Sequence, residues 1–176
     1  MDLMTTNNEQ RIIKNIDSCD ITKNMVFILV FTDANQHKLV REKALAKIKT
    51  NVNWQQELIA RLQNDWAPES FTFLASNNVD SPEIFLEPVR KGILIQAKLV
   101  REQIKSTSRS SSNYSNLFSW ELERVLRTVD RFDNMGMNYL PAMKELRKAL
   151  NEPSEYEKSV FSITPYLDKW IKKHEK

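Results

Sequence analysis

Glycine is nearly absent from this sequence, with only Gly92 and Gly136 among 176 residues. An average domain contains about 7% glycine, which forms the positive-φ turns of β-hairpins and the loops that close around phosphate groups. The sequence also contains no Asn-Gly or Asp-Gly dipeptide, the strongest short signal of a hairpin. The shortage therefore favours a helical chain and argues against a glycine-rich nucleotide-binding loop.

Histidine and cysteine are scarce as well, since the chain contains only His37, His174 and Cys19. These residues have neither metal-ligand spacing nor a Cys-x-x-Cys arrangement, so we expect no metal site and no cofactor. The carboxylates are dispersed, and no Glu-x-x-His motif indicates a di-metal bundle. We expect no catalytic residues and interpret the chain as non-enzymatic. A single cysteine forms no internal disulfide, which favours the reducing environment of the cytoplasm.

The sequence has no apolar run of the length that a bilayer requires. Its most apolar segment, 25–31, is seven residues long, whereas a membrane-spanning helix needs about 20. The first residues also lack the basic and then apolar order of a signal peptide. We therefore expect no membrane partner. The 41% apolar and 28% charged residues are typical of a soluble, folded chain, and the length fits a single all-α domain over 1–176.

Helical periodicity and helix-start signals recur along the chain. Thr6 and Glu9 have the spacing of a capping box, which predicts a short helix to about residue 17. Asp20 fits an N-cap for the apolar segment, where we favour a helix to about residue 32, buried on all sides, over a strand. Further helices are predicted at 39–48, from Asn53 through Trp66, from Pro68, from Asp80 with a break at Pro88, at 88–105, at 117–134 with a stop near Gly136, at 141–150 and from Thr164 as N-cap. The total is eight to ten helices.

One short pattern occurs twice. An aspartate precedes a Val-Arg pair, Asp33 before Arg41 and Asp80 before Arg90, and the two pairs lie 49 residues apart. This resembles the second half of a HEAT or armadillo repeat, whose units run roughly 40–47 residues. The resemblance covers about residues 20–105 and implies that these four residues bridge neighbouring repeat units. It implies HEAT-like helical hairpins; an irregular or orthogonal helical bundle is the alternative.

A serine-rich stretch divides the chain. We expect a flexible loop over 106–114, between an N-terminal part with the repeat-like pattern at 20–105 and a C-terminal helical part at 115–176.

Two predicted helix faces carry candidate binding residues. The helix at 88–105 places apolar residues on one side and basic residues within an arc of about 100° on another. This basic arc consists of Arg90, Lys91, Lys98, Arg101 and Lys105, with Arg109 in the loop beyond. The helix at 117–134 carries Trp120, Arg124, Arg127 and Arg131 on the side opposite its apolar stripe. Trp120 and Arg124 are one turn apart, close enough for a cation–π contact.

Three hypotheses follow for function. The first is a scaffold or interaction module that binds an acidic protein surface through Trp120 and the arginines around it, because Trp and Arg are enriched at binding hot spots. The second is a helical subunit that binds RNA or single-stranded DNA through the basic arc, which steep salt dependence would identify. The third is an obligate complex that covers apolar surface near Ile95, Leu99, Trp54 and Trp66. Solvation alone explains either face equally simply.

Overall fold

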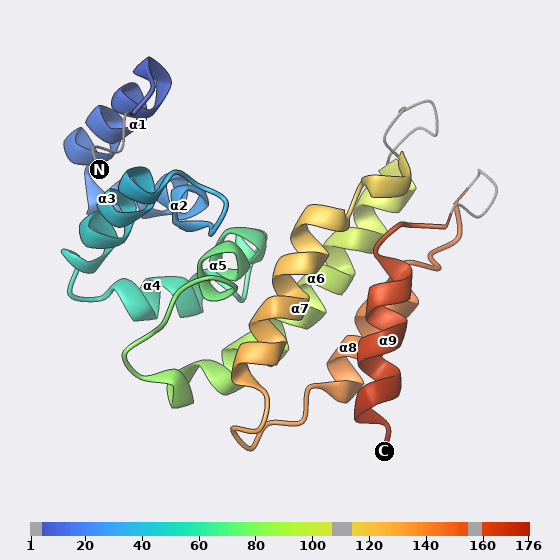
Figure 1. Cartoon of the computed structure of the whole chain (residues 1–176). Coiled ribbons are helices and arrows are strands. Elements are labelled where there is room, and N and C mark those ends of the chain that lie inside the picture. The colour runs from blue at the N-terminus through green and yellow to red at the C-terminus, as the bar shows by residue number, and fades with distance from the viewer. Residues whose placement is uncertain (1–4, 107–113, 155–159) are drawn as a thin grey trace.

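The computed structural model describes residues 5–106, 114–154 and 160–176. Within these ranges the chain forms nine α-helices and three short 3₁₀ helices and contains no strand, so the predicted all-α class is confirmed. Figure 1 shows α1–α5 gathered at one end and the longer α6 and α7 leading into α8 and α9. The elements are α1 Asn7–Ser18, α2 Ile21–Leu29, η1 Val30–Thr32, α3 Lys38–Lys49, α4 Trp54–Arg61, α5 Ala67–Leu74, η2 Pro82–Phe85, α6 Leu86–Ser106, η3 Tyr114–Asn116, α7 Ser119–Phe132, α8 Leu140–Ala149 and α9 Thr164–His174.

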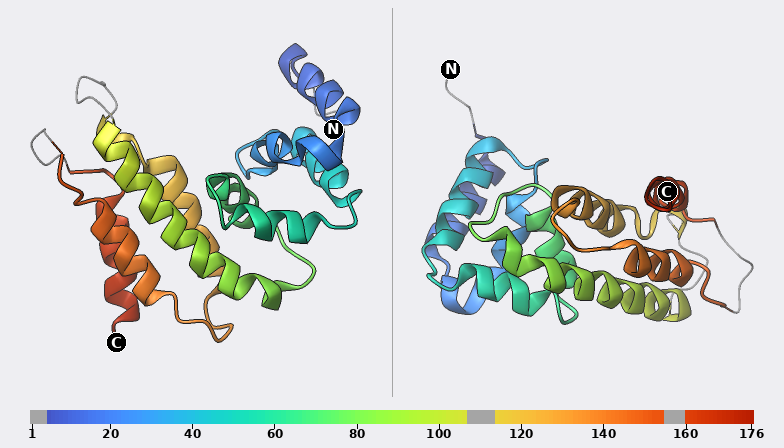
Figure 2. Two further views of the ribbon diagram at one scale, coloured as in Figure 1. Left: turned by 180° about the vertical axis from the view of Figure 1, so that it is seen from behind. Right: turned by 90° about the horizontal axis from the view of Figure 1, so that it is seen from below.

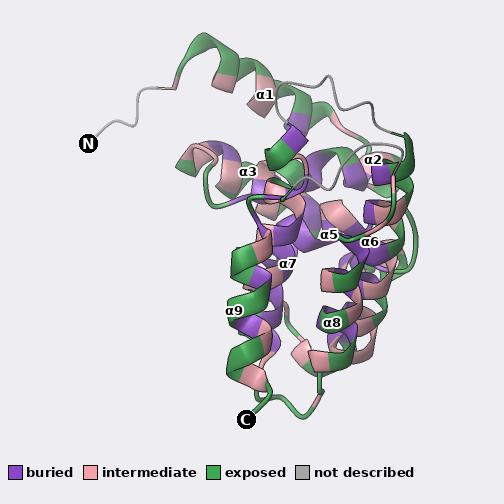
Figure 3. Ribbon diagram, turned by 90° about the vertical axis from the view of Figure 1, so that its right-hand side faces the viewer, coloured by how far each residue is buried: buried purple, intermediate pink, exposed green. Residues whose placement is uncertain are grey.

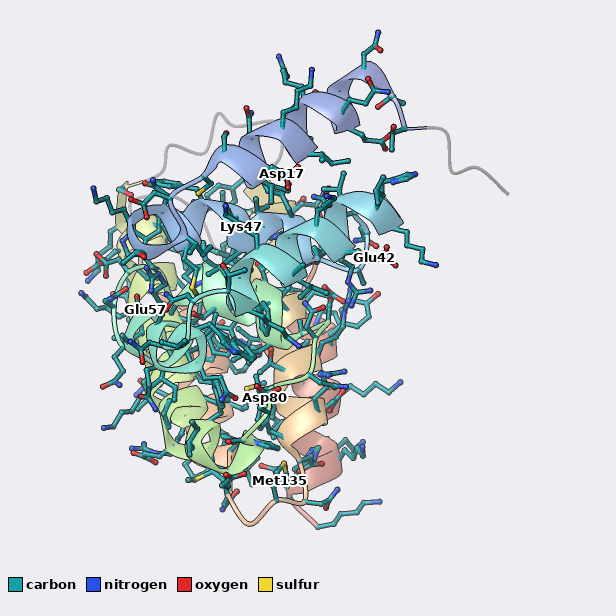
Figure 4. The ribbon with its side chains drawn as sticks, turned by 90° about the vertical axis from the view of Figure 1, so that its left-hand side faces the viewer. Asp17, Glu42, Lys47, Glu57, Asp80 and Met135 are labelled. Carbon is teal, nitrogen blue, oxygen red and sulfur yellow. The ribbon has the colours of Figure 1, made fainter. Side chains whose placement is uncertain are left out.

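The first helix begins as its sequence predicts and packs on α3. The Thr6 hydroxyl accepts a hydrogen bond from the Glu9 amide, and the Glu9 carboxylate accepts one from the Thr6 amide, which completes the capping box. Lys47 of α3 donates to the Asp17 carbonyl at 2.8 Å, and Figure 4 shows the two residues on adjacent helices. Most of α1 remains exposed, as Figure 3 shows.

The apolar segment 25–31 is helical, but the expectation that it is buried on all sides is wrong. Asp20 caps α2 by accepting the Thr22 amide at 3.1 Å. Met25 and Leu29 are buried, whereas Phe27 is 62% exposed. Neighbouring helices α3 and α5 cover the inner side of α2, so its outer side faces solvent. The Phe27 ring meets only the edge of Trp66, with ring centroids 6.2 Å apart.

Two predicted boundaries are shifted. Helix α4 ends at Arg61 instead of continuing through Trp66, which lies in the turn before α5 and is exposed. Asn64 closes that turn, because its side chain donates to the Ala60 carbonyl and accepts from the Trp66 amide. Helix α6 begins at Leu86 and passes through Pro88 without a break. Amides of the first helical turn have no partner within the helix, so a proline there removes no hydrogen bond.

Helices α6–α9 pack around a common apolar core (Figure 2). The side of α6 expected to be apolar is buried, and the buried residues of the helix are Val89, Gly92, Ile93, Gln96, Ala97, Val100 and Ile104. It packs most extensively on α8, which begins around Pro141 as expected, and α5 lies against α7. Figure 3 shows buried residues along the facing sides of these helices. The predicted stripe of α7 is buried too, except for Leu126, which is half-buried.

The loop between α7 and α8 contains the chain's positive-φ residues among those described, Asn134 at 62° and Gly136 at 97°. Helix α7 ends at Phe132, earlier than the expected end at about residue 134, and the left-handed residue next to its C-cap Asp133 is Asn134, so Gly136 does not cap the helix. Helix α9 starts one residue earlier than expected, with Ile163 rather than Thr164 at the N-cap position. Residues 107–113 of the predicted serine-rich loop lie outside the described residues. No helix in the described ranges is both long and apolar enough to cross a membrane.

Candidate functional site

Trp120 lies on the solvent side of α7, but it is also part of the fold. Its side chain is 45% exposed, and the Arg124 guanidinium carbon lies 3.2 Å from its ring centroid. The predicted cation–π contact is therefore present. One face of the indole covers Arg124, and the rest of its surface remains accessible to a partner.

Arg124 is buried, so its predicted place on an exposed face is wrong. Its Nε donates to Asp33 Oδ2 at 3.0 Å, and its Nη2 lies 2.9 Å from the same oxygen. Asp33 is completely buried, while Arg124 is 4% exposed. Asp33 follows η1, 91 residues earlier in the chain. The pair joins α7 to the N-terminal helices, and Arg124 is a residue of the fold rather than of a binding surface.

The remaining two arginines of the predicted site lie in different hollows. Arg131 donates to Asn78 Oδ1 at 2.6 Å and borders a hollow of about 430 Å³ at the end of α7, near Met135. Figure 4 labels Met135 at this end of the molecule. Arg127 lies on the other flank of α7, where it pairs with Glu123 and faces α9. The structure therefore separates Trp120, Arg124, Arg127 and Arg131 instead of assembling them into one patch.

A hollow of about 400 Å³ separates α7 from α9, and we call it the α7/α9 groove. Leu126 and Trp170 contribute its apolar part, and Tyr166, 65% exposed, stands at its edge. Its lining residues are Glu123, Leu126, Arg127 and Asp130 from α7 and Tyr166, Lys169, Trp170 and Lys173 from α9. Apolar surface with charges around it is the usual composition of a protein-binding groove.

The charges of the α7/α9 groove that face no opposite charge among the described residues are those of Asp130, Lys169 and Lys173, and their sum is positive. Glu123 accepts hydrogen bonds from both Arg124 and Arg127, and Asp130 accepts one from the Trp170 indole at 3.0 Å. Both carboxylates of the groove are therefore engaged. Lys169 and Lys173 make no ion pair with any residue that the structure describes. Their ammonium groups, one helical turn apart, remain available to carboxylates of a partner.

Tyr166, Lys169 and Lys173 were not predicted as site residues. They follow the spacing i, i+3 and i+7, which places them on one face of α9. This periodicity was a signal in the sequence, but lysines near the end of a helix are also favoured by its dipole. Only the position of α9 beside α7 shows that this face borders a groove.

His174 fastens the end of α9 to the loop that follows α7. Its ring stacks on Trp170, with centroids 3.7 Å apart, while Nδ1 lies 2.8 Å from the Trp170 carbonyl and Nε2 lies 3.0 Å from Asp133 Oδ2. Both partners are acceptors, so both ring nitrogens donate only when the imidazole is protonated. Burial by itself lowers the pKa of His174, but the hydrogen bonds to Asp133 and the Trp170 carbonyl outweigh it and raise the pKa above its usual value.

We expect His174→Gln to destabilise the protein more at pH 5.5 than at pH 9. The folded-state pKa of His174 is raised, so its stabilising contribution is complete below the unfolded pKa of about 6.5 and is lost as pH rises through the folded pKa. Asp133 favours the protonated ring, and the neighbouring Lys173 opposes it. Urea unfolding at the two pH values should show a difference on the order of 1 kcal/mol. Equal losses at both would contradict this role of the imidazolium.

The basic arc of α6 is largely neutralised by carboxylates. Arg90 pairs with Glu87. Arg101 and Lys105 both pair with Glu152. The arc's remaining described ion pairs are Lys98 with Asp65 and Glu102, and Arg101 with Glu145. Lys91 is exposed and pairs with no described residue. The predicted exposure of the arc is thus correct for Lys91, Lys98 and Lys105, whereas Arg90 and Arg101 are half-buried. Arg109 lies outside the described residues.

The residues that the repeat resemblance implied are placed as follows. Arg41 donates to the Ser76 carbonyl at 2.6 Å and to Asn77 Oδ1 at 2.8 Å, which ties α3 to the end of α5. Asp33 pairs with Arg124 and not with either repeat arginine. Arg90 bonds within its own helix, to Glu87. Asp80 pairs with neither repeat arginine, and its backbone amide donates a hydrogen bond to Gln55 Oε1 at 2.9 Å. The repeat itself stays a prediction.

Comparison of the chain with models of protein families, with curated proteins and with solved structures found no match. The site therefore has to be interpreted from its own geometry. Among the described residues, no three His, Cys, Asp or Glu side chains are placed to hold a metal ion.

Proposed function

We propose that this protein is a non-enzymatic interaction module and that the α7/α9 groove binds an acidic segment of a protein partner. The observation that carries the proposal is the pair of unpartnered lysines, Lys169 and Lys173, beside exposed aromatic surface at Tyr166. Carboxylates spaced one turn apart on a helix match ammonium groups spaced one turn apart on α9. An aliphatic or aromatic residue between them would cover Leu126.

Trp120 extends this surface along α7. It lies seven residues before Arg127, so both occupy the same side of the helix. Its exposed indole offers a large, rigid apolar contact whose position is already fixed by Arg124, so binding requires little further ordering. In this proposal Trp120 and Arg127 bind the partner, while Arg124 keeps the tryptophan in place.

Nucleic-acid binding through the α6 arc is less favoured by the geometry. Four of the five described cations of the arc pair with carboxylates, those of Glu87, Asp65, Glu102, Glu145 and Glu152, and Lys91 pairs with none among the described residues. Phosphate binding draws on an excess of positive charge that is free to displace counterions. The paired arc of α6 offers no such excess among the described residues, whereas α9 does.

The test is affinity purification from a native lysate with the double variant Lys169→Glu/Lys173→Glu. Two charge reversals should lower the recovery of a specific protein about tenfold or more, because carboxylates would then face carboxylates. The matched control is Lys14→Glu/Lys148→Glu, which changes the net charge equally at two exposed lysines outside the groove. Each sample is divided in two, and one half is treated with nuclease while the other is left untreated.

The outcomes separate the hypotheses. A protein retained by the wild-type chain and by the control, but lost with Lys169→Glu/Lys173→Glu, supports the α7/α9 groove. Equal recovery with both double variants would contradict it. A partner that disappears on nuclease treatment would instead identify a nucleic acid, and recovery would then fall steeply as the salt concentration rises.

A further inference from the structure

A third hollow, of about 420 Å³, lies where α5, α6 and α7 meet. Pro68, Leu99, Val100 and Phe118 contribute apolar walls, and Gln96 and Glu121 contribute polar groups. Figure 1 shows the three helices side by side, and they are in mutual contact. Its charged lining residues are glutamates, unlike the lysines of the α7/α9 groove, and we call it the acidic hollow. The volume is in the usual range for a small ligand or a peptide side chain.

Gln96 is the first sign that the acidic hollow is a binding site. The side chain is 2% exposed, yet its Nε2 has no hydrogen-bond partner in the described part of the chain. Burying an amide without a partner costs about 1–3 kcal/mol, and native proteins contain few such groups. A leucine would fill the same volume without this loss, so the amide needs a reason other than packing.

Two carboxylates, that of Glu121 in the wall of the hollow and that of Glu69 next to Pro68, each have one oxygen without a hydrogen-bond partner among the described residues. The Oε2 atoms of Glu121 and Glu69 are both buried and accept no hydrogen bond from the described residues. Glu69 follows Pro68 at the start of α5. Burial raises the pKa of Glu69 and, together with the charge of Glu121, outweighs the lowering effect of a hydrogen bond from the Glu69 backbone amide.

The described lining of the acidic hollow contains no opposing charge. None of the described residues that line it is a lysine, an arginine or a histidine. Glu102 lines it as well, but its carboxylate already faces Lys98 at 3.7 Å. The carboxylates of Glu69 and Glu121 therefore have no cationic partner among the described residues, and a cation beside Glu121 would displace no ion pair that the structure describes.

We propose that the acidic hollow binds a basic side chain, arginine or lysine, presented by an extended peptide segment of a partner. The cation would lie beside Glu121, its aliphatic chain would pack on Leu99 and Phe118, and a backbone carbonyl of the same segment would accept a hydrogen bond from the Gln96 amide. A peptide supplies both the cation and the acceptor, whereas a simple amine supplies only the cation. This site has the opposite charge to the α7/α9 groove and does not depend on it.

The experiment measures the binding of a fluorescein-labelled peptide, acetyl-Ala-Leu-Arg-Leu-Ala, to the full chain by anisotropy at low salt. The matched probe has citrulline in place of arginine, which keeps the shape and removes the charge. We expect the citrulline peptide to bind at least about tenfold more weakly. Glu121→Gln should lower the affinity for the arginine peptide by a similar factor, while Glu83→Gln, at an exposed carboxylate of η2, should leave it unchanged.

A second variant tests the amide without endangering the fold. Gln96→Leu removes an unpartnered buried group and is expected to leave the thermal melting temperature equal or higher, while the arginine peptide binds at least about threefold more weakly. Equal affinity for the arginine and citrulline peptides would overturn the proposal, and so would unchanged affinity in both Glu121→Gln and Gln96→Leu. Butylguanidine that competes as strongly as the peptide would also overturn it, since the occupant would then be a small cation.

Lys169→Glu/Lys173→Glu serves as the control for independence. It should bind the arginine peptide as the wild-type chain does, so failure at the α7/α9 groove and failure at the acidic hollow give different results.

Discussion

Alanine in place of Arg124 is expected to lower the free energy of unfolding by about 3–5 kcal/mol. The replacement leaves the Asp33 carboxylate completely buried with no cation beside it. Asp33 Oδ1 would still accept the Asn35 amide at 2.9 Å, but one neutral donor does not compensate a buried negative charge. The Arg124→Ala replacement also removes the guanidinium that supports the Trp120 ring, so the indole should become more mobile.

Urea unfolding followed by far-ultraviolet circular dichroism measures this loss. The control is Arg127→Ala, which breaks a partly exposed pair with Glu123 and should cost less than about 1 kcal/mol. The double variant Asp33→Asn/Arg124→Met removes both charges together. Its loss of unfolding free energy should be much smaller than the sum of the losses of Asp33→Asn and Arg124→Met measured singly. Additive losses in this cycle would show that the pair does not stabilise the fold.

The Asp33–Arg124 pair shows where helical periodicity no longer predicts which side chains are buried. The sequence predicted which side of α7 is buried, and Leu122, Val125 and Val129 lie there. It could not predict that Arg124, on the other side, is covered as well. The cover comes from the turn at Asp33, and contacts across 91 residues leave no trace in local spacing.

Most local helix-start signals were dependable, although the break expected at Pro88 is absent and the N-cap expected at Thr164 lies at Ile163. The capping box at Thr6, the N-cap at Asp20 and the proline starts at Pro68 and Pro141 each predicted a helix that the structure contains. Their physical basis is the set of unsatisfied amides in a first helical turn, which the sequence itself reveals. Trp66 shows the limit, because the spacing continued the α4 stripe while Asn64 ended the helix.

The candidate sites depended far more on tertiary packing. Arg101 of α6 appeared solvent-exposed in the sequence because Glu145 and Glu152 approach it only when α8 packs on α6. Likewise, Gln96 resembles any polar residue of an amphipathic helix until α5 and α7 close over it. Charge on a helix is readable from sequence, but whether that charge is free requires knowledge of the neighbouring helices.

Gly92 gives the second large effect, because its missing side chain is what lets α6 approach α4 and α5. A Cβ atom added there would lie 2.9 Å from Leu62 Cδ2, 3.0 Å from Phe71 Cζ and 3.2 Å from the Leu62 carbonyl oxygen. The first two atoms belong to side chains and can shift, but the carbonyl oxygen moves only with the backbone of the α4 end. We therefore expect Gly92→Val to lower the free energy of unfolding by roughly 3 kcal/mol, the upper end of the usual cost of overpacking.

Gly92→Ala separates two opposing terms at this position. Alanine favours the helix over glycine by about 1 kcal/mol, so this variant should lose much less than Gly92→Val and come close to the wild-type stability. Lys91→Val is the matched control, since it places the same β-branched side chain at the adjacent exposed position of α6 and should cost less than about 1 kcal/mol. Chemical unfolding of the three variants side by side decides the matter. If Gly92→Val were as stable as Lys91→Val, α6 would not need its close approach to Leu62 and Phe71 at this position. The scarcity of glycine elsewhere in the chain would then reflect helix content alone.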